Sequence, residues 1–282
     1  MTRFPRTVRN IGTRIKASVS GTDADVQAFL DATGITDQTI IDALNDFIGT
    51  LKGSSLYTGK WITMYPIVGG NADDHKFNFV NPVDTDGGFR LSYLGTGIFT
   101  HDANGIRGNG VNTVGLYCST HVNALNDVPS STSAVFWYVN ADADDVTEKG
   151  IDFGCLNGSK RYWGAGDEGS PTALAYNALN TTTSLNVSAT GQTGNFSAKR
   201  DGTAAILRKN GSDLINTTSA LNTMPDEDIY FVARNIGGGT PEAQSSKTFC
   251  FFGIMNEAPT SGEVTIIENA IEQLQVDLSR EN

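Results

Sequence analysis

Hydrophobic and polar residues alternate with a period of two through most of the chain after residue 54. Such runs are typical of β-strands that bury one face. Turn sequences rich in Asn-Gly and Gly-Gly separate the runs, and Asn210-Gly211 marks the clearest two-residue hairpin. Helices do not alternate with the runs, so the pattern predicts a mainly β protein, an antiparallel β-sandwich of jelly-roll type. We predict strands at 61–68, 88–95, 133–140, 150–157, 203–216, 228–235 and 248–255.

Residues 22–53 follow a helical period instead. Thr22 and Asp25 form a capping-box-like start to a first helix, which we expect to end at Gly34. Thr36 is then expected to cap a second helix. Such a short pair cannot fold alone, so its apolar face should pack on the β body. That face carries Ile40, Ile41, Leu44, Phe47, Ile48 and Leu51.

A third helix is predicted at 261–279, where Thr260 and Glu263 form a capping box. Its apolar residues recur at spacings of three and four. This spacing fits two arrangements: a helix packed on the sandwich, or a short coiled-coil seam that joins copies of the chain into a homo-oligomer, with a trimer favoured. The residues concerned are Val264, Ile267, Ile271, Leu274 and Leu278.

The chain divides into a basic arm (1–21), the helical pair (22–53) and a sandwich with its C-terminal helix (54–282). The net charge is −11, so the acidic body is not expected to bind nucleic acid. The arm is the exception and is interpreted as an attachment segment. It would dock on an acidic protein partner or, alternatively, contact packaged nucleic acid. Its cations are Arg3, Arg6, Arg9, Arg14 and Lys16.

The sequence also bears on the compartment. No apolar run follows the basic start, so we expect no secretion signal, and no stretch is long enough to insert in a membrane. Cys118, Cys155 and Cys250 are odd in number and lack paired spacing, which suits free thiols in a reducing compartment.

Motifs for catalysis are missing from the sequence. There is no Gly-x-Ser-x-Gly elbow, no phosphate-binding loop, and no strand with acids at alternating positions as in many sandwich glycosidases. Cys118 and His121 form a lone pair, and a strand cysteine is typically an inert apolar residue. The acid run at 226–228 is interpreted as a solvated strand start. We therefore predict that the protein is not an enzyme, and that it needs no cofactor.

Two stretches are candidates for ligand binding. Tyr162 and Trp163 are neighbours on a predicted strand, so one ring faces the core and the other could stack on a sugar. Gly237, Gly238 and Gly239 form a loop suited to recognition at one end of the sandwich.

The best candidate for a cation is the acid run at 140–150, whose carboxylates are ligands that Ca²⁺ prefers. The alternative is a solvated loop, because the glycine that an EF-hand loop needs is absent. The carboxylates are Asp142, Asp144 and Asp145.

An ordered set of blocks resembles bacteriophage virion proteins that carry a concanavalin A-like (laminin-G-like) jelly-roll domain. The blocks lie at 23–57, 65–93, 105–117 ("GIRGNGVNTVGLY") and 206–281, where an apolar last strand leads into an acid-capped helix. The match spans roughly 22–282. The ending "VDLSREN" departs from the family's usual one, and the basic arm has no counterpart.

The resemblance implies a virion structural protein: a tail fibre, spike or capsid decoration component, assembled in the cytoplasm of a host bacterium and docked to other virion proteins by its N-terminal segment. The alternative is a receptor-binding module that recognises a host-surface glycan. A carbohydrate-active enzyme is the third interpretation. The family carries no well-defined catalytic site, so none is transferred.

Overall fold

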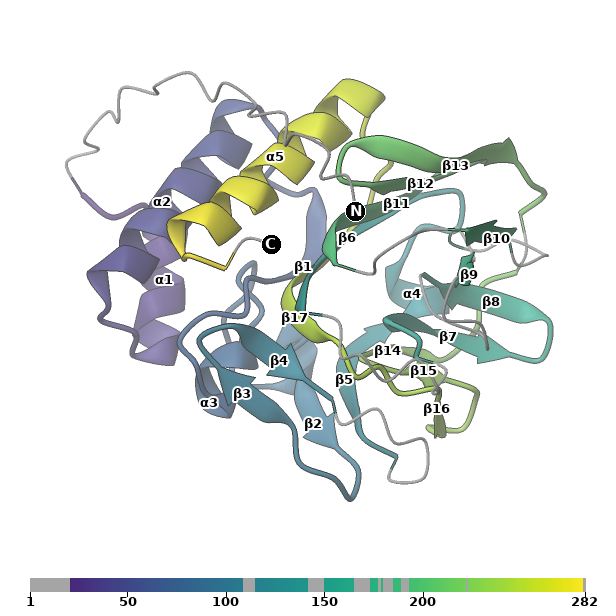
Figure 1. Cartoon of the computed structure of the whole chain (residues 1–282), viewed down its shortest axis with the longest axis horizontal. Coiled ribbons are helices and arrows are strands. Elements are labelled where there is room, and N and C mark those ends of the chain that lie inside the picture. The colour runs from purple at the N-terminus through teal and green to yellow at the C-terminus, as the bar shows by residue number, and fades with distance from the viewer. Residues whose placement is uncertain are drawn as a thin grey trace, which may run out of the picture.

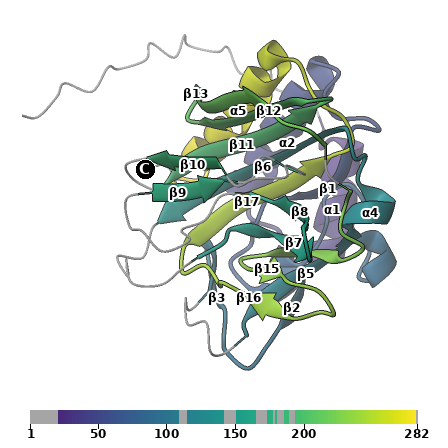
Figure 2. The ribbon, with the colours of Figure 1, turned by 90° about the vertical axis from the view of Figure 1, so that its right-hand side faces the viewer.

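The computed structural model describes residues 21–108, 115–141, 150–164, 173–176, 179, 185–188, 193–221 and 223–280. Two large sheets pack face to face, and helices cover the outer face of one of them (Figures 1 and 2). The chain is therefore mainly β, with an N-terminal helical pair and a C-terminal helix, as the sequence predicts.

The first sheet, called sheet A, carries the helices. Its strand order is β13 (Ser212–Thr218), β12 (Ala204–Lys209), β11 (Gly194–Asp201), β6 (Thr132–Ala141), β17 (Thr248–Met255), β4 (Gly105–Arg107) and β3 (Thr100–Asp102), and β1 (Trp61–Tyr65) also pairs with β17.

The second sheet, called sheet B, has the order β16 (Pro241–Glu242), β15 (Arg234–Asn235), β7 (Phe153–Asn157), β14 (Asp228–Phe231), β5 (Tyr117–Asn123) and β2 (Ser92–Leu94), and β8 (Lys160–Trp163) pairs with β7. A separate ribbon joins β9 (Ala173–Tyr176) to β10 (Leu185–Ser188). Pairing is antiparallel throughout sheet A, whereas β15 runs parallel to β7 in sheet B.

The helices are α1 (Ala24–Thr33), α2 (Gln38–Gly53), α3 (Ala72–His75), α4 (Ala124–Asp127) and α5 (Ser261–Asp277), with a 3₁₀ turn at Asp86–Gly88. Of these, α1, α2 and α5 form the layer over sheet A (Figure 1).

Strand β6 shows why the core has two layers. Val135, Trp137 and Val139 face sheet B, whereas the intervening Phe136 and Tyr138 face the helices. A central strand covered on both faces reads as one continuous apolar run. The run "SAVFWYVN" has this property.

Strand β17 departs from simple alternation. Its register with β6 shifts between Phe249 and Phe251, so the intervening Cys250 is a bulge residue. Cys250 and Phe251 consequently both face the helical layer, and Phe47 of α2 packs edge-on against Phe251 with ring centroids 5.7 Å apart.

The helix starts differ by one residue from the predicted ones. Asp23, not Thr22, caps α1, and its carboxylate accepts a hydrogen bond from the Asp25 backbone N–H. Asp37, not Thr36, caps α2 in the same way. In both cases the Asp carboxylate lies two residues before the N–H that it accepts from, which is a favoured capping geometry. Gly34 ends α1 with φ 75°, as predicted.

Helix α5 begins with the predicted capping box and packs inside the chain. It lies against α2 and β11, and Ser197 donates a hydrogen bond of 2.6 Å to Glu268. The helix ends at Asp277, two residues earlier than predicted. Because the predicted seam is buried against this chain's own core, it is not free to join copies of the chain.

Several predicted strands are shorter than expected. Phe89, with φ 56°, interrupts the segment 88–95, which leaves only β2. Val232, with φ 68°, separates β14 from β15 within 228–235. The break at Phe89 directly follows Gly87 and Gly88. The break at Val232 has no adjacent glycine or proline to mark it, and a positive φ is unfavourable for a β-branched residue.

Candidate functional site

Loops from both sheets gather at one end of the sandwich, called the loop end. They are the α4 segment with the residues up to 131, the turn 158–159, the turn 202–203, the segments 219–221 and 223–227, and the loop 236–240. Backbone hydrogen bonds from Gly202 to Ser131 and from Ser219 to Thr203 tie these loops together. The acid run 226–228 lies among them, and its three carboxylates have different partners.

Asp226 supports α4. Its Oδ1 accepts a hydrogen bond of 3.0 Å from Asn123 Nδ2, while Asn123 Oδ1 caps α4 by accepting from the N–H groups of Leu125 and Asn126. The carboxylate therefore fixes the residue that caps this short helix.

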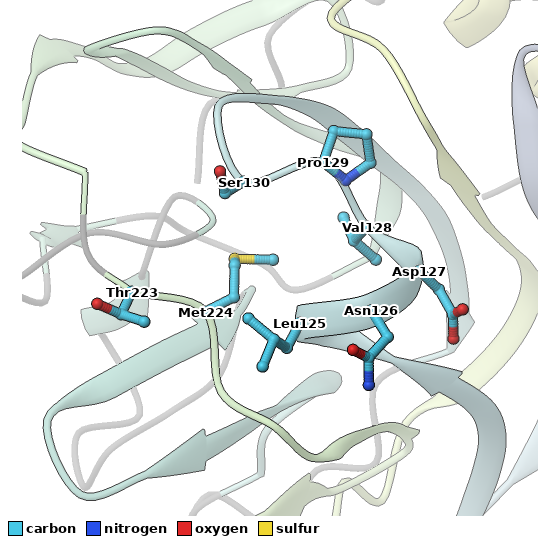
Figure 3. Close-up of a pocket in the computed structure, with 8 residues that line it drawn as sticks. All are labelled: Leu125, Asn126, Asp127, Val128, Pro129, Ser130, Thr223 and Met224. Carbon is cyan, nitrogen blue, oxygen red and sulfur yellow. The ribbon is translucent and has the colours of Figure 1, made fainter.

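An open pocket of about 480 Å³ lies beside α4 (Figure 3). Its walls come from α4 and the chain that follows it, and from residues 223–224 on the opposite side. The lining is half apolar and half polar: Leu125, Asn126, Asp127, Val128, Pro129, Ser130, Thr223 and Met224.

Glu227 holds the predicted glycine loop in place. Its Oε1 accepts 3.1 Å hydrogen bonds from Asn157 Nδ2 and from the Gly238 backbone N–H. The three glycines have φ values of 103°, 61° and 76°, a region that favours glycine. The loop is thus a fixed structure built around one carboxylate.

Two tyrosines stack on the outer face of sheet B, next to this loop. The Tyr117 and Tyr230 rings lie 4.3 Å apart between centroids at an angle of 25°. Tyr230 is only 4% exposed, whereas Tyr117 is partly buried and lies over it. Gly239 lies next to Tyr230, since a Cβ at this position would be in van der Waals contact with the Tyr230 hydroxyl at 3.5 Å.

Polar side chains continue along the same face. Asp228 Oδ2 accepts a hydrogen bond of 3.5 Å from Ser119 Oγ. Burial raises the pKa of the Asp228 carboxyl, while nearby His121 offsets part of that rise. Ser92 Oγ lies 2.8 Å from His121 Nε2. This places hydrogen-bonding groups of both kinds beside the stacked tyrosines.

The Ser92, His121 and Asp86 group does not form a catalytic triad. Asp86 Oδ1 approaches at 3.3 Å the same Nε2 that faces Ser92 Oγ, whereas a triad needs the carboxylate on the other ring nitrogen. Cys118 is fully buried on the opposite face of β5, and burial raises the pKa of its thiol well above the usual range. The geometry of this face suits binding by hydrogen bonds and stacking.

The predicted site residues have different outcomes. The Tyr162 ring faces the core and is fully buried, so no ligand can stack on it. The prediction of Tyr162 as a sugar-stacking residue is therefore corrected: its ring is part of the core. Trp163 lies in β8, but its side chain is outside the described residues. The glycine loop lies at the loop end. The calcium candidates Asp142, Asp144 and Asp145 and the arm cations Arg3, Arg6, Arg9, Arg14 and Lys16 also lie outside the described residues.

Tyr117, Tyr230 and Asp228 were missed by sequence reasoning. The sequence did contain a signal for the two tyrosines. Tyr117 and Tyr230 each neighbour a core residue of the same strand, so their side chains must face outward. Within the part of the chain that the structure describes, no cluster of three or more His, Cys, Asp or Glu is placed to hold a metal ion. No helix among those residues is long and apolar enough to cross a membrane.

Comparisons of the sequence with protein-family models and with curated proteins gave no match. Solved structures do resemble the fold. The sialidase of Trypanosoma rangeli in complex with sialic acid is 11% identical, with a TM-score of 0.54 over 83% of this chain and 39% of the sialidase chain. Its covalent intermediate with difluorosialic acid gives 12% identity and a TM-score of 0.53 over 84% and 39%.

Domain 4 of AbnA, a GH43 extracellular arabinanase from Geobacillus stearothermophilus in complex with arabinotriose, is 13% identical, with a TM-score of 0.47 over 74% of this chain and 98% of that domain. The chain spans about two fifths of the sialidase chain that it matches. At these identities the similarity to the sialidase structures concerns the fold alone, and it agrees with the β-sandwich described above.

Proposed function

We propose that this protein is a glycan-binding module whose binding surface is the outer face of sheet B beside the loop 236–240. The observation that carries the proposal is the stack of Tyr117 on Tyr230, with Asp228 and His121 along the same face. Tyr117 is the outer ring of the stack and is partly exposed.

The chemistry of sugars matches this surface. A pyranose has an apolar C–H face that packs on an aromatic ring, and hydroxyl groups that need both donors and acceptors. Tyr117 would supply the aromatic platform for the sugar ring. Asp228 would accept hydrogen bonds from sugar hydroxyls, and the Ser92 hydroxyl and the His121 imidazole would supply further hydrogen-bonding groups. The glycine loop would bound this binding surface on one side, because Glu227 fixes the loop in one conformation.

The structural comparisons support testing glycans first, since the sialidase structures contain sialic acid or a fluorinated derivative of it. Those ligands belong to the sialidases. For this chain the ligand class is proposed from the tyrosine stack and its polar neighbours. Binding without catalysis is part of the proposal, because Cys118 is buried away from His121 and the Ser92 group lacks triad geometry.

A glycan array followed by titration calorimetry tests the proposal. Tyr117→Ala should weaken binding of the selected glycan by about two- to twelvefold, since stacking on one aromatic ring is worth roughly 0.5–1.5 kcal/mol. Ile266→Ala is the matched control, because Ile266 is an exposed apolar residue of α5, which covers sheet A and not sheet B. Equal binding by Tyr117→Ala and the unmodified protein would rule out this face. Release of reducing sugar would favour the carbohydrate-active enzyme instead.

Display on a phage virion is a second proposal. It is supported by the resemblance over roughly residues 22–282, and by the way α1, α2 and α5 join into one layer that closes the sandwich. The arm 1–21 would then dock the protein to other virion proteins. Deleting residues 1–20 should leave the thermal stability unchanged and abolish incorporation into particles. Normal incorporation of this truncation would contradict the docking role.

A further inference from the structure

We propose a second binding site, for a small oxyanion, between the two sheets at the loop end, with the Arg200 guanidinium as its main ligand. The class comprises phosphate, sulfate or a carboxylate group. The site is separate from the tyrosine stack, which lies on the outer face of sheet B, and the two proposals stand or fall independently.

Arg200 is the starting observation. It has no exposed surface, yet its Nη2 donates to the Ser219 carbonyl while Nε and Nη1 find no partner among the described residues. A buried guanidinium without an anion carries a desolvation penalty that nothing offsets. The donors that lack partners therefore need acceptors, and the charge needs a counter-charge.

The strand register places other polar groups beside it. Arg200 pairs with Ser133 across β11 and β6, and both alternate with helix-facing neighbours, so both side chains face sheet B. The Tyr162 hydroxyl lies near Ser133 and makes no hydrogen bond of normal geometry to the described residues. Burial raises the pKa of this hydroxyl, which keeps it a neutral donor.

These groups share one chemical character. Arg200 Nε–H and Nη1–H₂ and the Tyr162 O–H are all donors, and Ser133 is a hydroxyl that can also donate. A guanidinium edge binds two oxygens of a planar or tetrahedral oxyanion side by side, and a neighbouring hydroxyl can bind a third. A neutral or cationic ligand would leave the guanidinium charge unbalanced.

The pocket beside α4 adjoins the segment that holds Arg200. Ser219, which holds Arg200, begins the segment that continues to Thr223 and Met224 in the pocket wall. Val128 and Met224 line the pocket and also belong to the core between the sheets. The wall of the pocket therefore shares residues with the layer in which Arg200 lies.

Thermal unfolding of the whole chain in sodium phosphate tests the site, with sodium chloride of equal ionic strength as the reference. The unfolding temperature should rise in phosphate beyond the chloride reference, because a ligand at about a hundredfold excess over its Kd multiplies the folding equilibrium constant by about 100. Arg200→Met should lose this increment. Arg90→Met should keep it, since Arg90 pairs with Asp84 and Asp86 elsewhere on the surface.

Tyr162→Phe keeps the ring and removes one hydrogen-bond donor, so it should reduce the increment in unfolding temperature without abolishing it. This variant tests the site even if Arg200→Met does not fold. Glucuronate and inorganic sulfate, each compared at the phosphate concentration, distinguish an acidic sugar from a free anion. The proposal is overturned if the unmodified protein shows no increment in any of the three anions, or if Tyr162→Phe and Arg200→Met respond as the unmodified protein does.

Discussion

Lys247 Nζ lies 2.7 Å from Asp152 Oδ1, and the two side chains are only 5% and 0% exposed. Trp137 Nε1 donates a 3.0 Å hydrogen bond to the other carboxylate oxygen of Asp152. Trp137 belongs to β6 of sheet A, whereas Asp152 directly precedes β7 of sheet B. This buried group therefore joins the two sheets by polar contacts inside an otherwise apolar core.

Removing one partner of this ion pair should be costly. Lys247→Met leaves the Asp152 carboxylate buried without its cation, and we expect the free energy of unfolding to fall by about 3–5 kcal/mol. Urea denaturation measures this. Lys60→Met is the matched control, because Lys60 pairs with Glu257 at a partly exposed site, where such pairs contribute about 0–1 kcal/mol. Equal losses in the two variants would contradict the stabilising role of the buried pair.

The His75 and His101 pair should make stability depend on pH. The Gly70 N–H donates to His75 Nε2, so the proton is on His75 Nδ1, which donates to His101 Nδ1 at 3.1 Å. Burial, His101 and Arg280 lower the pKa of His75 to about 3, and burial also lowers the pKa of His101. Protonating His75 places a charge in a buried site. Protonating His101 on Nδ1 places two N–H groups face to face, one on each ring.

The unfolded chain protonates its histidines near pH 6.5 and so binds more protons than the folded chain between about pH 6.5 and 3. The contribution of His75 to stability is therefore complete above pH 6.5 and decreases as the pH falls toward 3. At pH 4.5 the loss should be about 2–3 kcal/mol. His75→Gln should be less stable at pH 7, and the difference should shrink at pH 4.5. A pH-independent difference would contradict this account.

Glu227 should control the mobility of the glycine loop. Glu227→Ala removes the acceptor of the Gly238 N–H, so we expect hydrogen exchange of that amide to accelerate about tenfold or more. Asp226→Ala is the control, because Asp226 holds Asn123 and not the loop. Unchanged exchange at Gly238 in Glu227→Ala would show that the glycines hold their conformation without the carboxylate.

The capping box of α5 should contribute measurably to stability. Thr260→Ala removes the side-chain acceptor for the Glu263 N–H, and we expect a loss of about 1 kcal/mol in the free energy of unfolding. Ser261→Ala at the next position should change stability by less than about 0.5 kcal/mol. Chemical denaturation distinguishes the two, and equal effects would argue against the cap.

The sequence alone predicted the elements whose cause is local. Thr260 and Glu263 are three residues apart, and Gly34 provides the positive φ of a helix end, so α5 and the end of α1 could be identified from neighbouring residues. The Asn210-Gly211 hairpin is of the same kind: Asn210 and Gly211 adopt φ of 49° and 78° between β12 and β13. Their energetics involve only a few adjacent residues.

The candidate sites depend on contacts between distant parts of the chain. The acid run 226–228 looked solvated because its sequence does not show that Asp226 meets Asn123 or that Glu227 meets Asn157 and Gly238. In the same way, Tyr162 and Trp163 alternate on a strand, but only packing against sheet A decides that Tyr162 faces inward.

Local propensities and the period-two pattern thus determined the strands, the helices and the sandwich class, because these follow from backbone conformation and the burial of apolar faces. The positions of Tyr117 over Tyr230, of Lys247 against Asp152, and of Arg200 opposite Ser133 were decided only by the tertiary structure. Each of these pairs joins segments that are far apart in the chain, and no short stretch of sequence contains that information.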